Sequence, residues 1–230
     1  MKTNTWKWFY SILAFVMVIA FATSCNKNDE QTPETITDIN GNIYHSVTIG
    51  TQIWMVENLK VTKFNDGTPL PLISDSAEWA SLSAPGYCWY DNNETAYKDS
   101  YGALYNGYAT KTGKLAPTGW HIATDAEWTI LTTYLGGENI AGGKLKEKGT
   151  FHWAEPNTEA TNETGFTALP GGYRYPMGQF VGGGFIGYWW SSSDYYTGSI
   201  YKFMSNSDKL LGSNNTNNEF GYSVRCIKNQ

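Results

Sequence analysis

The sequence is poor in charge, and the charge that it has is not clustered. Only 16% of its 230 residues are Asp, Glu, Lys or Arg, and the formal net charge is −5. No run of Lys or Arg alternates with aromatic residues, as a groove that follows a phosphate backbone requires. We therefore expect no nucleic-acid partner.

The short motifs of common hydrolases are also missing. The three histidines, His45, His121 and His152, are too far apart in sequence for the i, i+4 pair that binds zinc on a helix. No His-Glu-x-x-His or Gly-x-Ser-x-Gly segment occurs either. No repeat of fixed period is visible, which disfavours solenoids and propellers. A single domain without an enzymatic signature is the expectation.

The first of only three cysteines closes an amino-terminal leader. Lys2 and Lys7 precede an uncharged stretch that runs into Cys25, a pattern typical of a signal peptide and too short for a transmembrane span. Residues 21–25 resemble a bacterial lipobox, so we expect residues 1–24 to be a lipoprotein signal peptide and Cys25 to be acylated. An ordinary secretory signal is the weaker alternative. The expected location is the outer membrane, with the lipid anchor holding the protein at the cell surface.

Polar residues separate this leader from the folded part of the chain. Residues 25–38 contain no apolar cluster and carry Pro33, so we expect the lipidated cysteine to be followed by a solvated linker. Residues 39–230 then form one domain of ordinary size. An acidic pair, Asp29 and Glu30, is similar to signals that send lipoproteins to the outer face of the cell. This similarity favours exposure outside the cell.

Aromatic and β-branched residues predict strands at both ends of the domain. The runs at residues 43–49 and 53–55 indicate an amino-terminal hairpin. From Phe166 onward the chain is rich in glycine, and its strand-like runs lie near residues 166–169, 188–192, 200–204 and 222–227. The second half is therefore expected to contain short antiparallel strands joined by long loops.

One helix has a clear start and stop. Thr124 and Glu127 fit a capping box, and the pair Gly136-Gly137 ends the apolar periodicity that follows it. Ile130 and Tyr134 add to the apolar positions of this segment, so we expect a broad apolar surface packed deep against a sheet. A second, shorter helix is expected over residues 101–108.

Aromatic residues make up 16% of the sequence and gather around its glycine-rich part. Exposed rings of this kind can stack on the faces of sugars or anchor a protein interface. The candidate ligand-binding residues are Tyr173, Tyr175, Tyr195 and Tyr196. The rival interpretation is that these rings pack the core and the loops. For Trp189 and Trp190, burial is favoured over ligand contact.

A series of motifs, taken together, resembles a known family. The motifs are GTQIWM at 50–55, YGALYN at 101–106, PTGWH at 117–121, TDAEW at 124–128, LPGG at 169–172, WWSS at 189–192 and SVRC at 223–226. They resemble the Fibrobacter succinogenes major paralogous domain family over roughly residues 47–228. That family is similar to the C-type-lectin-like superfamily, which includes domains related to the formylglycine-generating enzyme. The resemblance implies an α+β fold of C-type-lectin-like form, with two helices and a small twisted antiparallel sheet with long loops.

The resemblance also bears on disulfides and metals. Many members have a cysteine just before the PTGWH segment, where this chain has Ala116, so pairing of Cys88 with Cys226 and two buried free thiols both remain open. Glu155 and Asn157 belong to a Glu-Pro-Asn tripeptide like the one that ligates calcium in sugar-binding C-type lectins. A solvated turn is the competing interpretation of that tripeptide. No other cofactor is expected.

These observations predict a non-enzymatic, lipid-anchored protein of the cell envelope. We expect a surface recognition or adhesion module that binds a glycan or a protein, because loops on a rigid scaffold commonly carry recognition. The expected partners are the membrane and that ligand. A structural component of the envelope or of a fimbria-like assembly is the alternative. An enzyme of the formylglycine-generating type is disfavoured because Cys88 and Cys226 lack the paired-thiolate pattern that binds copper.

Overall fold

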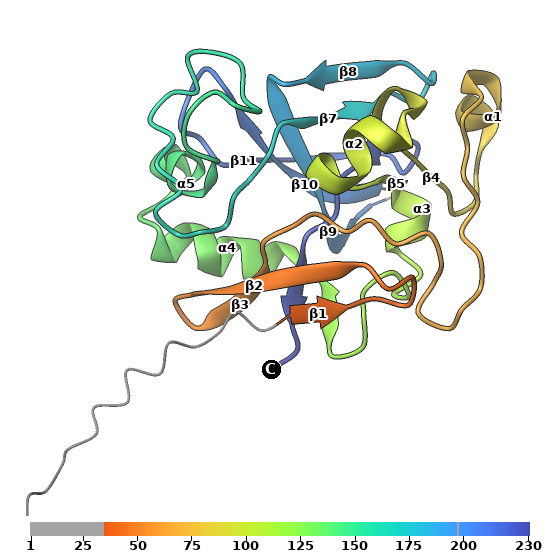
Figure 1. Cartoon of the computed structure of the whole chain (residues 1–230), viewed down its shortest axis with the longest axis horizontal. Helices are drawn as coiled ribbons and strands as arrows, with labels where there is room; N and C mark the ends of the chain where they lie inside the picture. The colour runs from red at the N-terminus through yellow and green to blue at the C-terminus, as the bar shows by residue number, and fades with distance from the viewer. Residues whose placement is uncertain (1–34, 197) are drawn as a thin grey trace, which may run out of the picture. The chain divides into compact units, whose positions relative to one another are not determined.

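Strands dominate the domain. The structure, a computed structural model, describes residues 35–196 and 198–230 (Figure 1). Its described strands form two sheets. The smaller sheet has the order β1 (Thr35–Thr37), β2 (Ile43–Ile49), β3 (Gln52–Met55), β13 (Cys226–Lys228) and β6 (Trp120–Ile122). The larger sheet has the order β11 (Gly212–Thr216), β10 (Gly198–Ser205), β9 (Ile186–Tyr195), β7 (Gly171–Arg174), β12 (Gly221–Tyr222), β5 (Leu104–Asn106) and β4 (Tyr87–Cys88), with β8 (Phe180–Gly183) beside β7.

The helices are short. They are α1 (Ser76–Ser81), α2 (Glu94–Tyr101), α3 (Gly107–Thr110), α4 (Asp125–Tyr134) and α5 (Glu138–Leu145), with a single 3-10 turn, η1 (Tyr90–Asn92). Helices α4 and α5 follow one another along one side of the domain (Figure 1). None of the helices in the described part of the chain has the length and apolar character that crossing a membrane requires.

The expectation of a small sheet with two helices is wrong, because the described residues form sheets of five and eight strands. The segment expected to be a helix over residues 101–108 instead contains the end of α2, all of β5 and the start of α3. Strands β4, β5 and β12 have only two or three residues each. Strands this short form because neighbouring strands pair with them, so their own sequence carries almost no periodic signal.

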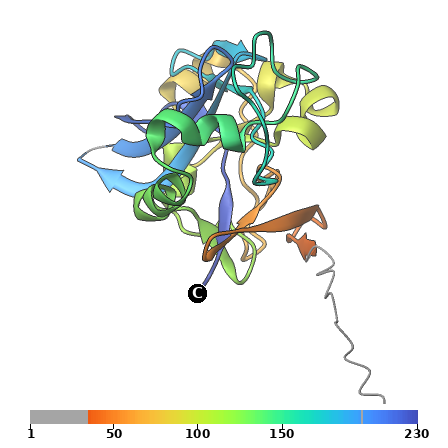
Figure 2. The ribbon, with the colours of Figure 1, turned by 90° about the vertical axis from the view of Figure 1, so that its left-hand side faces the viewer.

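The amino-terminal hairpin is confirmed, and a further strand extends it. Strands β2 and β3 pair antiparallel, with Val47 opposite Trp54. Strand β1 lies inside the segment expected to be linker, pairs with β2 and buries Ile36. Strand β13, near the end of the chain, pairs with β3 and β6. The described chain therefore begins and ends in the same sheet (Figure 2).

The capped helix is confirmed as α4. The hydroxyl of Thr124 accepts a hydrogen bond from the backbone N–H of Glu127 at 3.2 Å, and the Glu127 carboxylate accepts one from the Thr124 N–H at 2.8 Å. Trp128 on this helix is fully buried. The apolar side is narrower than expected, however, because Ile130 and Tyr134 are 51% and 65% exposed. Ile130 and Tyr134 therefore face solvent, and the buried side of the helix is formed by Trp128, Leu131 and Leu135.

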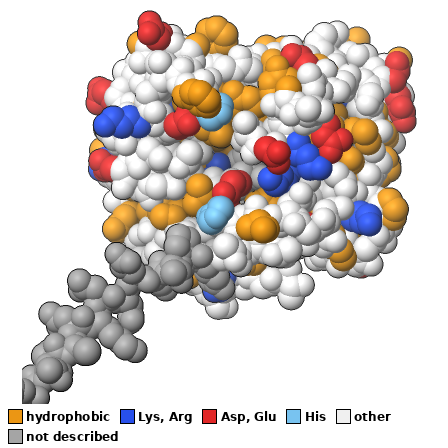
Figure 3. All heavy atoms as spheres, in the orientation of Figure 1, with side chains coloured by type: hydrophobic (Ala, Val, Ile, Leu, Met, Phe, Trp, Pro, Cys, Tyr) orange, Lys and Arg blue, Asp and Glu red, His pale blue; other side chains and the backbone are white. Residues whose placement is uncertain are grey.

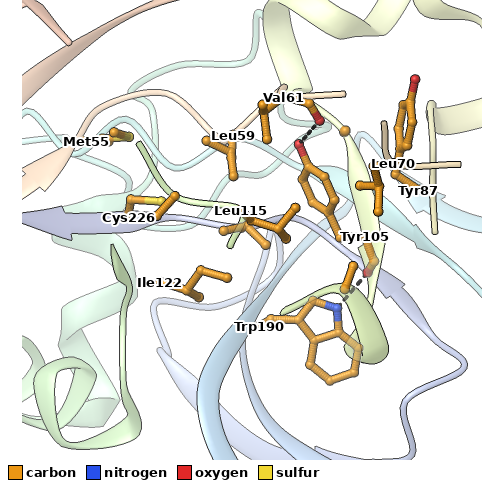
Figure 4. Close-up of a cluster of buried hydrophobic side chains, with 14 of the residues drawn as sticks. Met55, Leu59, Val61, Leu70, Tyr87, Tyr105, Leu115, Ile122, Trp190 and Cys226 are labelled. Carbon is orange, nitrogen blue, oxygen red and sulfur yellow. Dashed lines mark hydrogen bonds between the residues drawn. The ribbon is translucent and has the colours of Figure 1, made fainter. Parts of the chain in front are cut away.

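Tryptophan fills the core. Every tryptophan in the described residues is buried, which confirms the prediction for Trp189 and Trp190. In the main hydrophobic cluster the indole N–H of Trp190 donates to the carbonyl of Tyr105 at 2.7 Å, and the Tyr105 hydroxyl donates to the carbonyl of Val61 at 2.8 Å (Figure 4). The polar ends of Trp190 and Tyr105 are thus satisfied inside the core, whereas the buried indole N–H groups of Trp89 and Trp128 have no hydrogen-bond partner.

Three cations are buried among the described residues without a salt bridge. They are Lys146 and the chain's two arginines, Arg174 and Arg225, and each is at most 1% exposed. All three donate mainly to backbone carbonyls of segments outside helices and strands, and all three lie over aromatic rings. Buried carbonyls that no helix or strand satisfies need such donors. These side chains therefore hold the irregular segments in place.

Candidate functional site

One face of the larger sheet carries a continuous aromatic surface. Its members are Tyr173, Tyr175, Tyr188, Tyr201, Phe203 and Phe220, which are partly or substantially exposed and surround the buried Tyr222. Tyr188 stacks on Tyr222 with centroids 5.0 Å apart and ring planes 14° apart. The rings of Tyr201 and Phe220 approach Tyr222 at 5.0 Å and 5.5 Å. The rings thus form one supported surface and are not scattered side chains.

Strand register places these rings side by side. Tyr188 on β9 lies directly opposite Phe203 on β10, and Tyr201 lies opposite Asn214 on the edge strand β11. The ring of Phe203 covers Gly212, where a Cβ atom would come within 2.2 Å of it. Paired residues of neighbouring strands point to the same face of a sheet. The aromatic surface is therefore bordered by the polar side of β11.

The aromatic surface carries no charge. Burial and, after it, neighbouring tyrosines raise the pKa of Tyr173 and Tyr201, and the same causes raise the pKa of Tyr188 to about 12. No carboxylate or cation contributes to these shifts. In the described residues the hydroxyls of these tyrosines have no hydrogen-bond partner and are not buried. They are available to a ligand.

Two of the four tyrosines predicted from the sequence belong to this surface. Tyr173 contacts the rings of Tyr188 and Tyr222, and Tyr175 packs edge-on against Phe220 at 5.3 Å. The other two lie at the end of β9 and contact each other; they are Tyr195 and Tyr196. Tyr196 is 90% exposed. The structure therefore separates the four candidates into two places.

Sequence reasoning missed the strand residues of the aromatic surface. Tyr201 and Phe203 lie two positions apart in a predicted strand, so alternation alone places them on one face. That signal was present in the sequence. No local signal in the sequence indicates that Tyr188 and Tyr222 are neighbours, because β9 and β12 join this face only through pairing between distant segments.

The calcium candidates are not gathered into a ligand set. The Asn157 side chain is buried and donates through Nδ2 to the carbonyls of Glu147 and Gly149, while its Oδ1 has no partner. Glu155, two residues earlier, is exposed. Nowhere in the described part of the chain do three or more His, Cys, Asp or Glu side chains lie in a group that could hold a metal ion. Calcium binding therefore remains a prediction.

The two cysteines of the domain are buried free thiols, one of the two alternatives that the sequence left open. Cys88 and Cys226 lie in different hydrophobic clusters. Burial raises the pKa of each thiol to about 12. Both are thiols and not nucleophilic thiolates at neutral pH. Cys25 lies outside the described residues.

A second candidate region lies beside α2, on another part of the molecule. Acidic, basic and histidine side chains gather around a hollow on this face (Figure 3). One cavity of about 340 Å³ is lined by Tyr90, Asp91, Tyr97, Tyr101, Gly171, Gly183 and Gly184. A neighbouring cavity of about 280 Å³ includes Glu57, Glu147 and His152. Each of the three histidines pairs with a glutamate of its own, the pairs being His45–Glu57, His121–Glu127 and His152–Glu147.

Comparison with known proteins identifies the family. The family described as the Fibrobacter succinogenes major domain matches residues 47–228, which is most of the chain and includes all of the aromatic surface. No curated protein and no solved structure matches the chain. On the strength of the family match, the chain belongs to the Fibrobacter succinogenes major domain family.

Proposed function

We propose that this chain is a non-enzymatic, lipid-anchored protein of the cell envelope that binds a neutral glycan on its aromatic surface. The observation that carries the proposal is a row of uncharged rings whose hydroxyls have no protein partner. Sugar rings present C–H groups on their faces and hydroxyls at their edges. Aromatic faces with polar atoms at their rims match both.

The border of the surface supports the same ligand class. Strand β11 exposes Asn214 on the face that carries the rings, and its amide group both donates and accepts hydrogen bonds. Asn214 lies opposite Tyr201, which places an amide beside the rings. The described members of this surface include no charged side chain, so a charged ligand would find no compensating charge among them, whereas a neutral polyhydroxylated chain would find rings with an amide beside them.

Removing one ring from the aromatic surface is expected to weaken glycan binding. A glycan array screened with the full chain in detergent supplies the ligand, and Tyr201→Ala and Tyr175→Ala are then compared with the wild type by calorimetry. Each substitution should weaken binding by about tenfold, equal to about 1.4 kcal/mol, because truncating an aromatic contact residue removes stacking area. Tyr175 is exposed, and Tyr201 is only partly buried at the edge of the main hydrophobic cluster, so the fold should persist in both variants.

Tyr196→Ala is the matched control, since Tyr196 lies outside the aromatic surface and is 90% exposed. It should bind like the wild type. Loss of binding in Tyr196→Ala with retention in Tyr201→Ala would move the site to the end of β9. The array is run with and without a calcium chelator, and binding that requires calcium would assign Glu155 and Asn157 instead. An array without any hit would favour a structural envelope role.

Lipid anchoring is proposed from the leader sequence, and Cys25→Ala tests it. The wild type should incorporate labelled fatty acid and sediment with membranes, because several acyl chains together give stable anchoring. The variant should incorporate no label and should leave the membrane fraction. A Cys25→Ala protein that loses the label and still sediments with membranes would contradict the anchor.

A further inference from the structure

The cavity beside α2 differs chemically from the aromatic surface. Its wall is a chain of ring contacts: Tyr90 meets Tyr97 at 5.3 Å, Tyr97 stacks on Tyr101 at 5.8 Å, and Tyr101 meets the ring of His152 at 5.7 Å. We call this cavity, which lies between the tyrosines and the glycines opposite them, the tyrosine slot. Its volume of about 340 Å³ is that of a small ligand site.

Helix α2 builds the slot instead of adding to the core. None of its residues is buried, although it has eight of them. Tyr97 and Tyr101 occur at i, i+4 and so share one side of the helix. That side is the one that lines the slot. The inner side of α2 therefore lines the cavity and does not pack into the core.

The opposite wall is bare backbone, and the sequence enforces this. Tyr90 rests on two glycines: a Cβ atom at Gly172 or at Gly183 would come within 2.6 Å of its ring. Gly172 also has a φ of +62°, which favours glycine. The Tyr90 hydroxyl accepts a hydrogen bond from the Gly183 N–H at 3.0 Å. The glycine-rich run of the sequence therefore fixes one ring and leaves the slot open.

The slot has a carboxylate in its lining. Asp91 lines it, is exposed and forms no salt bridge among the described residues, and its charge contributes to the raised pKa of Tyr90. Glu147 contributes in the same way, after burial, to the raised pKa of Tyr101, although its carboxylate also pairs with His152. The nearby lysines are occupied elsewhere: Lys98 pairs with Glu94, and Lys60 pairs with Asp99. No lysine or arginine of the described residues lines the slot.

We propose that the tyrosine slot binds an organic ammonium group, such as the trimethylammonium of a choline-like ligand. Tyrosine faces attract a cation through the negative face of the ring, and this attraction is strongest for cations with little hydration. Asp91 supplies the full counter-charge at the rim. This site is independent of the glycan proposed for the aromatic surface, which carries no charge.

The test compares choline with its uncharged carbon isostere, 3,3-dimethylbutan-1-ol, in calorimetric titrations of the full chain in a non-ionic detergent without sugar groups. Choline should bind saturably, and the isostere should bind at least about tenfold more weakly, because it has the same shape without the charge. Sodium chloride at matched ionic strength serves as the salt control. Equal binding of both compounds, or no saturable binding of choline, would overturn the proposal.

Variants locate the binding. Tyr97→Ala should weaken choline binding by at least about tenfold, whereas Tyr97→Phe, which keeps the ring, should stay within about twofold of the wild type. Asp91→Asn should weaken choline binding and leave binding of the isostere unchanged. Tyr175→Ala on the aromatic surface should bind choline normally. Choline binding that persists in both Tyr97→Ala and Asp91→Asn would place the ammonium elsewhere and refute this site. Because α2 buries no residue, the midpoint temperature of thermal unfolding of Tyr97→Ala should remain close to that of the wild type.

Discussion

Replacing Arg225 by methionine is expected to lower the free energy of unfolding by about 4 kcal/mol. The Arg225 guanidinium donates to the carbonyls of Met55, Val56 and Phe166, the last at 2.7 Å, and to the Asn58 side chain at 2.9 Å. It also lies 4.2 Å from the centre of the Phe166 ring. Methionine fills a similar volume but donates nothing, so several buried oxygens would lose their only cationic donor.

Urea unfolding of Arg225→Met and of the wild type measures this loss of stability. The midpoint temperature of thermal unfolding should fall by about 8–16 °C in a chain of this size. Lys114→Met is the control: its ion pair with Asp66 is at the surface, with both side chains at least 41% exposed. Such surface pairs contribute about 0–1 kcal/mol. If the two variants lose equal stability, the buried carbonyls near Arg225 do not depend on its charge.

Replacing Lys146 by methionine is expected to lower the free energy of unfolding by about 3–5 kcal/mol, because it too removes a buried cation that donates to backbone carbonyls. The Lys146 ammonium donates to the carbonyls of Thr158, Ser205 and Asp208 at 3.1, 2.8 and 2.6 Å. These three carbonyls come from two segments, which also contact each other directly, since the Thr158 N–H donates to the Asn206 carbonyl at 2.8 Å. The side chain therefore ties the long loop around Thr158 to the connection between β10 and β11, and its removal should loosen both.

This second loss should depend on pH. Burial lowers the pKa of Lys146 to about 8, from an ordinary value of 10.5. Between these pH values the unfolded chain binds more protons than the folded chain, so the wild type should gain stability relative to Lys146→Met as pH rises through this window. Urea unfolding of both proteins at pH 7 and at about pH 10 measures the difference. Lys148 lies two residues after Lys146 and is exposed. The difference in stability between the wild type and Lys148→Met should therefore not change with pH. If the difference in free energy of unfolding between the wild type and Lys146→Met were the same at both pH values, the lowered pKa of Lys146 would be contradicted.

Local signals in the sequence predicted local structure. Thr124 and Glu127 cap α4 because their bonds involve only neighbouring residues, and the runs around Val47 and Trp54 pair across a tight turn. The size of the sheets was not predictable in this way. Strand β12 has two residues and pairs with β5 and β7, which lie more than forty residues before it, so only the assembled chain makes it a strand.

The candidate sites follow the same division. Tyr173 and Tyr175 stood out because they flank a glycine-rich segment, yet the support beneath them, Tyr222, comes from the far end of the chain. The tyrosine slot was not predicted, since its wall joins α2 with the glycines of β7 and β8. Buried cations were equally invisible: nothing in the sequence around Arg225 or Lys146 indicates burial, because their acceptors are carbonyls of distant segments.

The position of β1 has a mechanical consequence. A pull on the amino-terminal end of the described domain acts first on β1, an edge strand held to β2 by three residue pairs. The larger sheet, which carries the aromatic surface, lies outside this path. Release of β1 would add about 10 Å of extended chain before any strand of the larger sheet bears load. The edge strand thus acts as a short extensible link that absorbs strain before the aromatic surface is deformed.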